Sequence, residues 1–109
     1  MANYTLKPRR VNEIESREAR AWLGAMIEAE GCVTRYTNRV CGWRVAVTNK
    51  DPEIISAFLR WFGAGSVAYR LPSEVMIWYV DRKNDVSSVA EQLASYCMKV
   101  RKVQDDQAA

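Results

Sequence analysis

The order of amphipathic segments along the chain is the feature that most constrains its fold. A helical spacing of apolar residues before Gly31 gives way to two strand-like segments, at 32–37 and 40–48. The same order returns with a helix from Pro52 to Gly63 and strands near 66–71 and 75–81, and a third helix begins near Asn84 or Asp85. Helices repeat every 3.6 residues and strands every two. The sequence therefore predicts an α+β domain with the element order α-β-β-α-β-β-α.

Capping residues indicate where the first two helices begin and end. Asn12 with Glu15 has capping-box spacing, and Ser16 is an alternative N-cap for the first helix. Gly31 is a natural stop for that helix. The second helix has Asp51 as its N-cap, Pro52 at its first helical position and a glycine, Gly63, at its end. We expect its buried face to consist of Ile54, Ile55, Phe58, Leu59 and Phe62.

Alternation along the strands predicts one apolar and one polar sheet face. Cys41, Trp43, Val45 and Val47 share one face of the second strand. In the first strand, a core position for Val33 places Arg35 on the same side, which requires a bulge or a position beyond the covered part of the sheet. We expect the later strands to bury Val67, Tyr69, Leu71, Met76, Trp78 and Val80, and the third helix to bury Val86, Val89, Leu93 and either Tyr96 or Cys97.

Length and composition indicate one small domain. The 109 residues fit a basic N-terminal arm at 1–11, one domain at 12–104 and a C-terminal tail at 105–109. The net charge of +3 permits a nucleic-acid partner. Three cysteines without metal-type spacing are expected to be free thiols, and without a leader or membrane span we expect a cytoplasmic, organellar or phage-encoded protein. The absence of histidine excludes Ser-His-Asp and Cys-His catalysis, so carboxylates, amides and basic residues must carry any chemistry.

The first helix carries small residues at a regular spacing. Ala21, Ala25 and Ala29 recur every four residues, with Gly24 beside Ala25. A glycine inside a helix costs about 0.5–1 kcal/mol relative to alanine. Small residues at this spacing allow two helix backbones to approach closely. The pattern is typical of a helix that packs tightly against another helix. The alanines taken alone are explained as well by the high helix propensity of alanine.

The segment LGAMIEAEG, Leu23–Gly31, resembles the LAGLIDADG motif of homing endonucleases. Small and large apolar residues, two acids and the final glycine fall at the motif positions. The resemblance continues through VAVTNKDPEIISAFLRWFGAGSV and LASYCMKVRKVQ, and so covers roughly residues 16–104. It implies a core with a curved, four-stranded antiparallel sheet, and two such units that pair through their motif helices over the DNA major groove. One motif implies a homodimer on a pseudo-palindromic target.

The resemblance also implies the residues of the site. Glu30 corresponds to the family's metal ligand and Asn49 to a polar residue near the attacking water. From the residues alone, Asn49 is equally well explained as a turn residue before the Asp51 cap. The catalytic cation corresponds to Lys99, Arg101 or Lys102, of which we prefer Arg101 and then Lys102. Glu28 corresponds to an acid with a supporting role. The expected dimer interface comprises Ala21, Gly24, Ala25, Glu28 and Ala29.

The outward sheet face supplies the expected DNA contacts. It mixes hydroxyl, amide, aromatic and charged side chains that can hydrogen-bond base edges or touch thymine methyls. The predicted set is Thr34, Tyr36, Asn38, Arg44, Ser66, Arg70, Ile77, Tyr79 and Asp81.

These expectations combine into a homodimeric DNA endonuclease that uses Mg²⁺ or Mn²⁺ and hydrolyses phosphodiester bonds in double-stranded DNA. The resemblance places such a protein in a mobile intron or a phage-like element. Two alternatives on the same fold are a sequence-specific DNA-binding protein without cleavage and a maturase that binds intron RNA. No membrane partner is expected.

Overall fold

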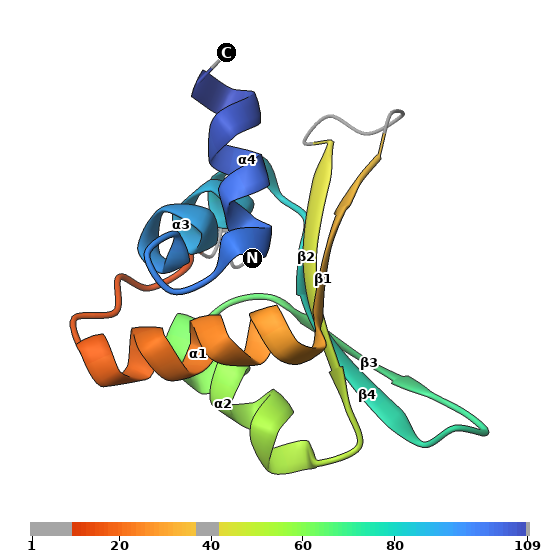
Figure 1. Ribbon diagram of the computed structural model, residues 1–109. Helices are drawn as coiled ribbons and strands as arrows, with labels where there is room; N and C mark the ends of the chain where they lie inside the picture. The colour runs from red at the N-terminus through yellow and green to blue at the C-terminus, as the bar shows by residue number, and fades with distance from the viewer. Residues whose placement is uncertain (1–9, 37–41, 109) are drawn as a thin grey trace, which may run out of the picture.

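The computed structural model describes residues 10–36 and 42–108, with side chains up to Asp106. Its elements are α1 (Arg17–Glu30), β1 (Gly31–Arg35), β2 (Trp43–Asn49), α2 (Pro52–Phe62), β3 (Ser66–Arg70), β4 (Val75–Val80), α3 (Lys83–Leu93) and α4 (Met98–Ala108). The four strands form one antiparallel sheet in the order β1-β2-β4-β3. All four helices lie on one side of this curved sheet (Figure 1). The predicted α+β class and sheet are confirmed.

The first two helices begin at two of the predicted caps. The Ser16 hydroxyl accepts a hydrogen bond from the Ala19 amide, so the structure selects Ser16 rather than Asn12 as the N-cap of α1. Asp51 caps α2 by accepting from the Glu53 amide. Gly63 ends α2 at φ 64°, a left-handed conformation that favours glycine.

The core lies between the helices and one face of the sheet. Trp43, Val45 and Val47 of β2 and Trp78 and Val80 of β4 point into it. Their cross-strand register, with Val45 opposite Val80 and Val47 opposite Trp78, makes one continuous apolar surface. The Trp78 ring stacks on Phe62 and packs at a tilt against Phe58, which joins α2 to the sheet.

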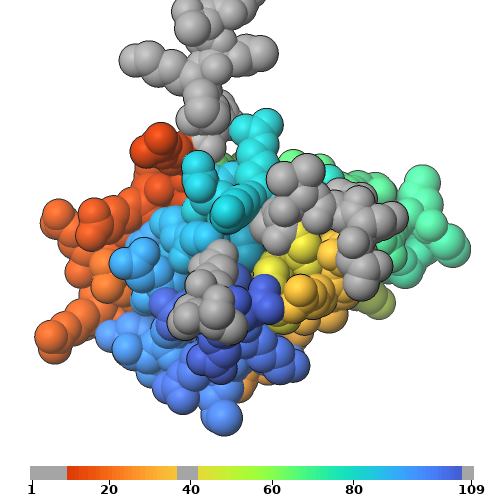
Figure 2. Space-filling view, turned by 90° about the horizontal axis from the view of Figure 1, so that it is seen from above, coloured from red at the N-terminus to blue at the C-terminus, as the bar shows by residue number. Residues whose placement is uncertain are grey.

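The β3–β4 hairpin departs from the predicted core. Val67, Tyr69 and Leu71 were expected to be buried, but they are 42%, 56% and 75% exposed. The hairpin projects beyond the helices at one edge of the molecule (Figures 1 and 2), so the helix-facing side of β3 has no cover. Leu59 on α2 was also expected in the core and is exposed. Alternation predicts which face a side chain occupies, but not how far the opposite layer extends.

A fourth helix follows the third at the C-terminal end of the domain. The third helix ends at Leu93, and the chain turns into α4, which contributes buried Val100 and Val103. Tyr96 is exposed and Cys97 is buried, so the second of the two predicted core alternatives is correct. The proposed division at residue 105 therefore falls inside a helix.

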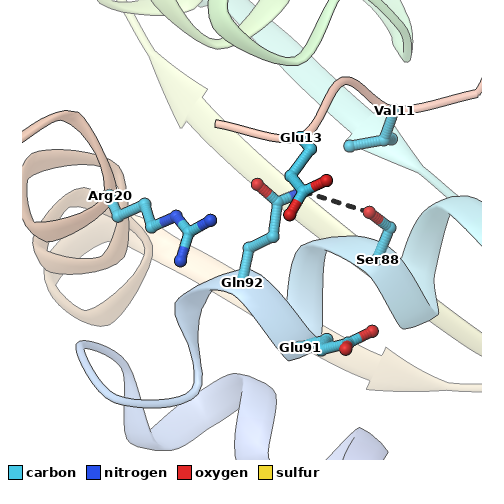
Figure 3. Close-up of a pocket in the computed structure, with 6 residues that line it drawn as sticks. All are labelled: Val11, Glu13, Arg20, Ser88, Glu91 and Gln92. Carbon is cyan, nitrogen blue, oxygen red and sulfur yellow. Dashed lines mark hydrogen bonds between the residues drawn. The ribbon is translucent and has the colours of Figure 1, made fainter. Parts of the chain in front are cut away.

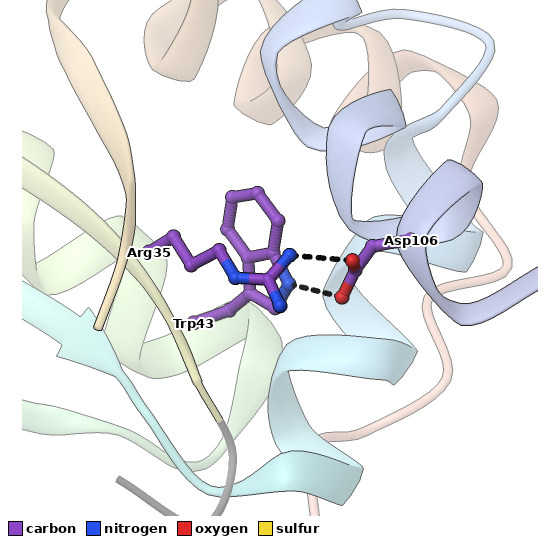
Figure 4. A network of polar contacts seen from close by, with 3 residues as sticks. All are labelled: Arg35, Trp43 and Asp106. Carbon is purple, nitrogen blue, oxygen red and sulfur yellow. Dashed lines mark hydrogen bonds and ion pairs between the residues drawn. The ribbon is translucent and has the colours of Figure 1, made fainter. Parts of the chain in front are cut away.

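The last turns of α4 also explain the position of Arg35. The β1–β2 register is unbroken, which excludes a bulge, and Arg35 lies opposite Trp43 on the helix-facing side. Its guanidinium pairs with Asp106 at 2.5 Å, and the Trp43 indole N–H donates to the same carboxylate at 3.0 Å (Figure 4). Arg35 thus lies beyond the apolar core, where an acid of α4 meets it.

The segment before α1 is attached to the domain rather than free. Val11 and Ile14 are buried, so the domain includes the end of the predicted 1–11 arm. The Val11 amide donates to the Asp85 carboxylate at 3.3 Å, and the Ile14 amide donates to the Gln92 amide oxygen at 2.7 Å. Gln92 also lines a polar pocket of about 440 Å³ between this segment, α1 and α3 (Figure 3).

None of the described helices is long and apolar enough to cross a membrane.

Candidate nucleic-acid interface

An exposed acid stands where α1 meets the sheet. Glu30 is the last residue of α1, and its carboxylate accepts a hydrogen bond from the Asn49 side-chain amide at the end of β2. Gly31 follows in an extended conformation. A Cβ at this position would lie 2.6 Å from the Ile27 carbonyl oxygen and 2.7 Å from its Cα. Glycine is therefore required here for close approach of the backbone, not for a left-handed turn. The two predicted residues Glu30 and Asn49 are brought together.

A lysine reaches the same helix end from α4. The Lys99 ammonium donates to the Gly31 carbonyl oxygen at 2.9 Å. Arg101 points elsewhere, because its Nε donates to the Ala94 carbonyl oxygen at 2.7 Å, and Lys102 is exposed with no hydrogen-bond partner among the described residues. Of the three basic residues considered from the sequence, Lys99 is the one that contacts the end of the motif helix, at the residue after Glu30. Sequence spacing could not select it, because the turn between α3 and α4 sets which face of α4 meets α1.

The other motif acid, Glu28, forms hydrogen bonds with the segment at the start of α4 that includes Lys99. Its carboxylate accepts from the Lys99 backbone amide at 3.4 Å and from the Cys97 thiol at 3.7 Å. Burial raises the pKa of the Cys97 thiol, and the nearby Glu28 charge raises it further, so the thiol stays protonated and can donate. These contacts lie within one chain and hold the start of α4 against α1.

The small residues of α1 do not all lie on one surface. Gly24 is buried against its own chain, since a Cβ there would lie 2.6 Å from the Tyr96 Cβ. Ala21 is half-buried, whereas Ala25 and Ala29 are exposed. Trp22 is 40% exposed, and its spacing from Ala25 and Ala29 puts all three on one side of the helix. The exposed apolar stripe of α1 therefore consists of Trp22, Ala25 and Ala29.

Among the described residues, the side chains predicted to contact DNA lie on the outward face of the sheet. Thr34, Arg44, Ser66, Arg70, Ile77 and Tyr79 alternate with residues of the helix-facing side, and Tyr36 and Asp81 continue the same alternation at strand ends. Asn38 lies outside the described residues. The same face also includes Cys32 and Thr48, which the sequence analysis did not select. Their alternation with Val33 and Val47 was the available signal. In Figure 1, no helix covers this face.

Arg44 lies near the start of β2, a central strand, and is held on three sides. Its Nη2 lies 3.3 Å from the Asp81 carboxylate, and its guanidinium carbon lies 4.3 Å from the Tyr79 ring centroid and 5.4 Å from that of Tyr36. Arg70, near the end of β3, is exposed and has no ion pair among the described residues. The two arginines of the face thus differ in how firmly they are positioned.

A single copy offers few metal ligands at the helix end. In the part of the chain that the structure describes, no group of three or more acidic, histidine or cysteine side chains is placed to hold a metal ion. Glu30 supplies an exposed carboxylate, the oxygen donor that Mg²⁺ prefers, and Mg²⁺ is commonly bound through one or two carboxylates plus phosphate oxygens. The donor set fits a metal only if ligands from other molecules complete it.

Solved structures of homing endonucleases share this fold. I-CvuI in complex with the I-CreI target is 18% identical, with a TM-score of 0.62 over 78% of this chain and 60% of that chain. The archaeal, intron-encoded I-Vdi141I complexed with DNA is 19% identical, with a TM-score of 0.59 over 78% of this chain and 62% of that one. The group I intron-encoded I-CeuI, also complexed with DNA, is 16% identical, with a TM-score of 0.64 over 89% of this chain and 56% of that one.

The fold is therefore that of the LAGLIDADG homing endonucleases, as the motif in α1 predicted. This chain spans less than two thirds of the length of the three proteins described. No protein-family model and no curated protein matches the sequence.

Proposed function

We propose that this protein is a homodimeric DNA endonuclease that depends on a divalent metal and hydrolyses both strands of a pseudo-palindromic target. The observation that carries the proposal is that Asn49 bonds the Glu30 carboxylate and Lys99 bonds the neighbouring Gly31 carbonyl oxygen, both at the C-terminal end of the motif helix. This end of the helix lies where β1 begins and β2 ends, and the same two strands carry Thr34 and Arg44 on the open face of the sheet. A carboxylate can hold a metal ion, an amide can orient a neighbouring group and an ammonium can stabilise developing charge, so phosphodiester hydrolysis is possible without histidine.

The limited donor set supports a site shared between two copies. Two Glu30 carboxylates about 4 Å apart would repel by roughly 4 kcal/mol at an effective dielectric near 20. A divalent cation held by these carboxylates would offset that repulsion, and phosphate oxygens of DNA would supply further ligands. The exposed stripe of Trp22, Ala25 and Ala29 on α1 would let the motif helices approach closely enough for this arrangement.

Each residue then has a distinct role. Bound Mg²⁺ supplies Lewis acidity toward the scissile phosphate and the attacking water. Glu30 holds the cation, and Asn49 orients the Glu30 carboxylate through its amide N–H. Lys99 places a positive charge beside the same backbone, where it can stabilise charge that develops on the phosphate. Among the structural neighbours, I-CvuI was solved on DNA in 2 mM Mg with the I-CreI target not cleaved, and on its own target in 2 mM Ca.

The decisive experiment selects targets from a library of randomised DNA duplexes. Sequences bound in Ca²⁺ are recovered and then tested for single-turnover cleavage in Mg²⁺. We expect wild type to cut both strands of the selected sites. Glu30→Gln should keep the binding and lose cleavage, because it retains the shape of the side chain and removes its charge.

Glu91→Gln is the matched control, since Glu91 is an exposed acid on α3 away from the motif helix end. It should bind and cut as wild type does. Cleavage by Glu30→Gln near the wild-type rate would refute the metal assignment. Tight, selective binding by wild type without cleavage would identify a DNA-binding protein that does not cut. Salt-resistant preference for structured intron RNA over duplex DNA would identify a maturase.

A further inference from the structure

The Arg44 side chain is more buried and makes more contacts than is usual for an arginine on an open sheet face. Arg44 lies on β2, a central strand, and only 25% of its side chain is exposed; the figure for Asp81 is 29%. The register places Ala46 opposite Tyr79 and Val45 opposite Val80. Asp81 therefore follows directly across from Arg44, and Tyr79 is its diagonal neighbour. The contacts of Arg44 follow from strand pairing and not from a chance surface rotamer.

These contacts fix the orientation of the guanidinium before any ligand arrives. Stacking on Tyr79 holds its plane, and the Asp81 carboxylate takes one hydrogen of Nη2. The Nε atom is buried without a hydrogen-bond partner, so the stem is packed as well. A long side chain that is already ordered loses less conformational entropy on binding than a flexible one.

The donors that remain have a particular geometry. Nη1 and the second hydrogen of Nη2 have no acceptor among the described residues. These N–H groups lie in the guanidinium plane and form a fork that can donate to two acceptors in that plane. In the major groove, guanine presents N7 and O6 in this arrangement, and adenine, thymine and cytosine do not.

The paired charges argue against a phosphate ligand. The Asp81 carboxylate neutralises Arg44 locally and would repel a phosphate oxygen that approached the same fork. Guanine carries no net charge, so its acceptors can share the guanidinium with Asp81. Exposed Arg70, without an ion pair among the described residues, is the better candidate for backbone contact.

We propose that Arg44 reads one guanine in each half-site of the target and that Asp81 and Tyr79 are positioning residues that make this reading specific. This inference rests on the proposed DNA-binding function and adds to it the base that is recognised and the residues that set the recognition. In a symmetric dimer, the two copies of Arg44 would require guanine at symmetry-related positions on opposite strands.

Binding selections on randomised duplexes in Ca²⁺ test the proposal without requiring cleavage. Wild type should recover a guanine at one position of each half-site, and replacing that base pair should weaken binding by about 10- to 100-fold. Arg44→Ala should lose the preference at that position alone. Asp81→Asn should reduce the same discrimination about tenfold and give a steeper salt dependence, because the charge of Arg44 is then free to attract phosphates.

Two controls separate positioning from folding. Arg70→Ala, on the same face, should keep the guanine at the Arg44 position, and Asp105→Asn, an exposed acid on α4, should change nothing. Asp81→Ser serves as a second variant if Asp81→Asn does not give a cooperative thermal transition. Unchanged guanine discrimination in the folded Asp81 variant, or an unchanged selected sequence in Arg44→Ala, would overturn the inference. If wild type selects no sequence at all, the proposed DNA recognition itself fails.

Discussion

At the scale of single residues, the candidate chemistry depends on which basic side chain of α4 contacts the end of the motif helix. The Lys99 ammonium donates a hydrogen bond to the Gly31 carbonyl oxygen. The Arg101 guanidinium instead donates to the Ala94 carbonyl oxygen at the end of α3. Both are cations of the same helix, and only one faces the motif. This difference makes a pair of matched substitutions informative.

Lys99→Gln should lower the single-turnover cleavage rate by about 10²- to 10⁴-fold, the range for a positioned catalytic side chain. Binding to the selected site in Ca²⁺ should change little, because one phosphate contact at most is lost. Arg101→Gln should cut at close to the wild-type rate. The reverse ranking of the two variants would return the catalytic assignment to Arg101.

At the scale of elements, α1 presents small residues to two different surfaces. Gly24 contacts Tyr96 in its own chain, and Ala25 is exposed on the neighbouring stripe. Larger side chains at these two adjacent positions are therefore expected to have different effects: one on the stability of the fold and the other on the affinity of the dimer.

Gly24→Ala should destabilise the fold itself, by about 1–3 kcal/mol of unfolding free energy, because the added methyl group overlaps the Tyr96 Cβ. Chemical denaturation measures this loss. The gain of about 0.5–1 kcal/mol in helix propensity offsets part of it. A Gly24→Ala protein at least as stable as wild type would show that Tyr96 moves aside without cost.

Ala25→Leu should leave the free energy of unfolding of the monomer nearly unchanged, because Ala25 is exposed in the single chain. It should instead weaken the dimer by about 1–3 kcal/mol through overpacking of the helix contact. Analytical ultracentrifugation over a range of concentrations distinguishes the two effects. A dimer as tight as wild type would place the interface elsewhere.

At the scale of the whole molecule, the segment before α1 joins α1 to α3. The Asp85 side chain accepts a hydrogen bond from the Val11 amide, and the Gln92 side chain accepts one from the Ile14 amide. Helix α3 therefore binds residues that precede α1 in the sequence. Burial raises the pKa of Asp85 above its usual value of 3.8; the Val11 hydrogen bond and the nearby Arg82 charge oppose this rise, and Asp81 adds to it. The folded state thus binds the Asp85 proton more tightly than the unfolded chain does.

The sign of the pH dependence follows from that difference. The contribution of Asp85 to stability is fully present below pH 3.8 and is lost as the pH rises through the raised folded pKa. Asp85→Asn keeps an acceptor for Val11 and removes the charge. It should therefore be more stable than wild type near neutral pH, and the two proteins should converge below pH 3.8.

Thermal denaturation of wild type and Asp85→Asn across this pH range measures the difference directly. The comparison cancels the titration of all other carboxyl groups, which act in the opposite direction when they are ion-paired. A difference in melting temperature that is constant with pH would show that Asp85 does not titrate between the folded and unfolded states as its burial indicates.

Local physical rules made much of the fold accessible from the sequence alone. Ser16, Asp51 and Gly63 act on the helix ends next to them, and the alternation around Val45 and Trp78 assigns the two sheet faces. These effects act over a few neighbouring residues, so they can be predicted from the spacing of residues in the sequence. The resemblance of the motif and of the following strand also singled out Glu30 and Asn49, but their hydrogen bond is seen only in the structure.

Tertiary structure decided whatever depends on the reach and rotation of one layer over another. The uncovered Val67, Tyr69 and Leu71 reflect the length of the helical layer, and the choice of Lys99 reflects the turn that sets the rotation of α4. Gly24 is small because Tyr96, 72 positions later in the sequence, lies against it. No local pattern reports such distances, because the contacts form only when distant segments pack together.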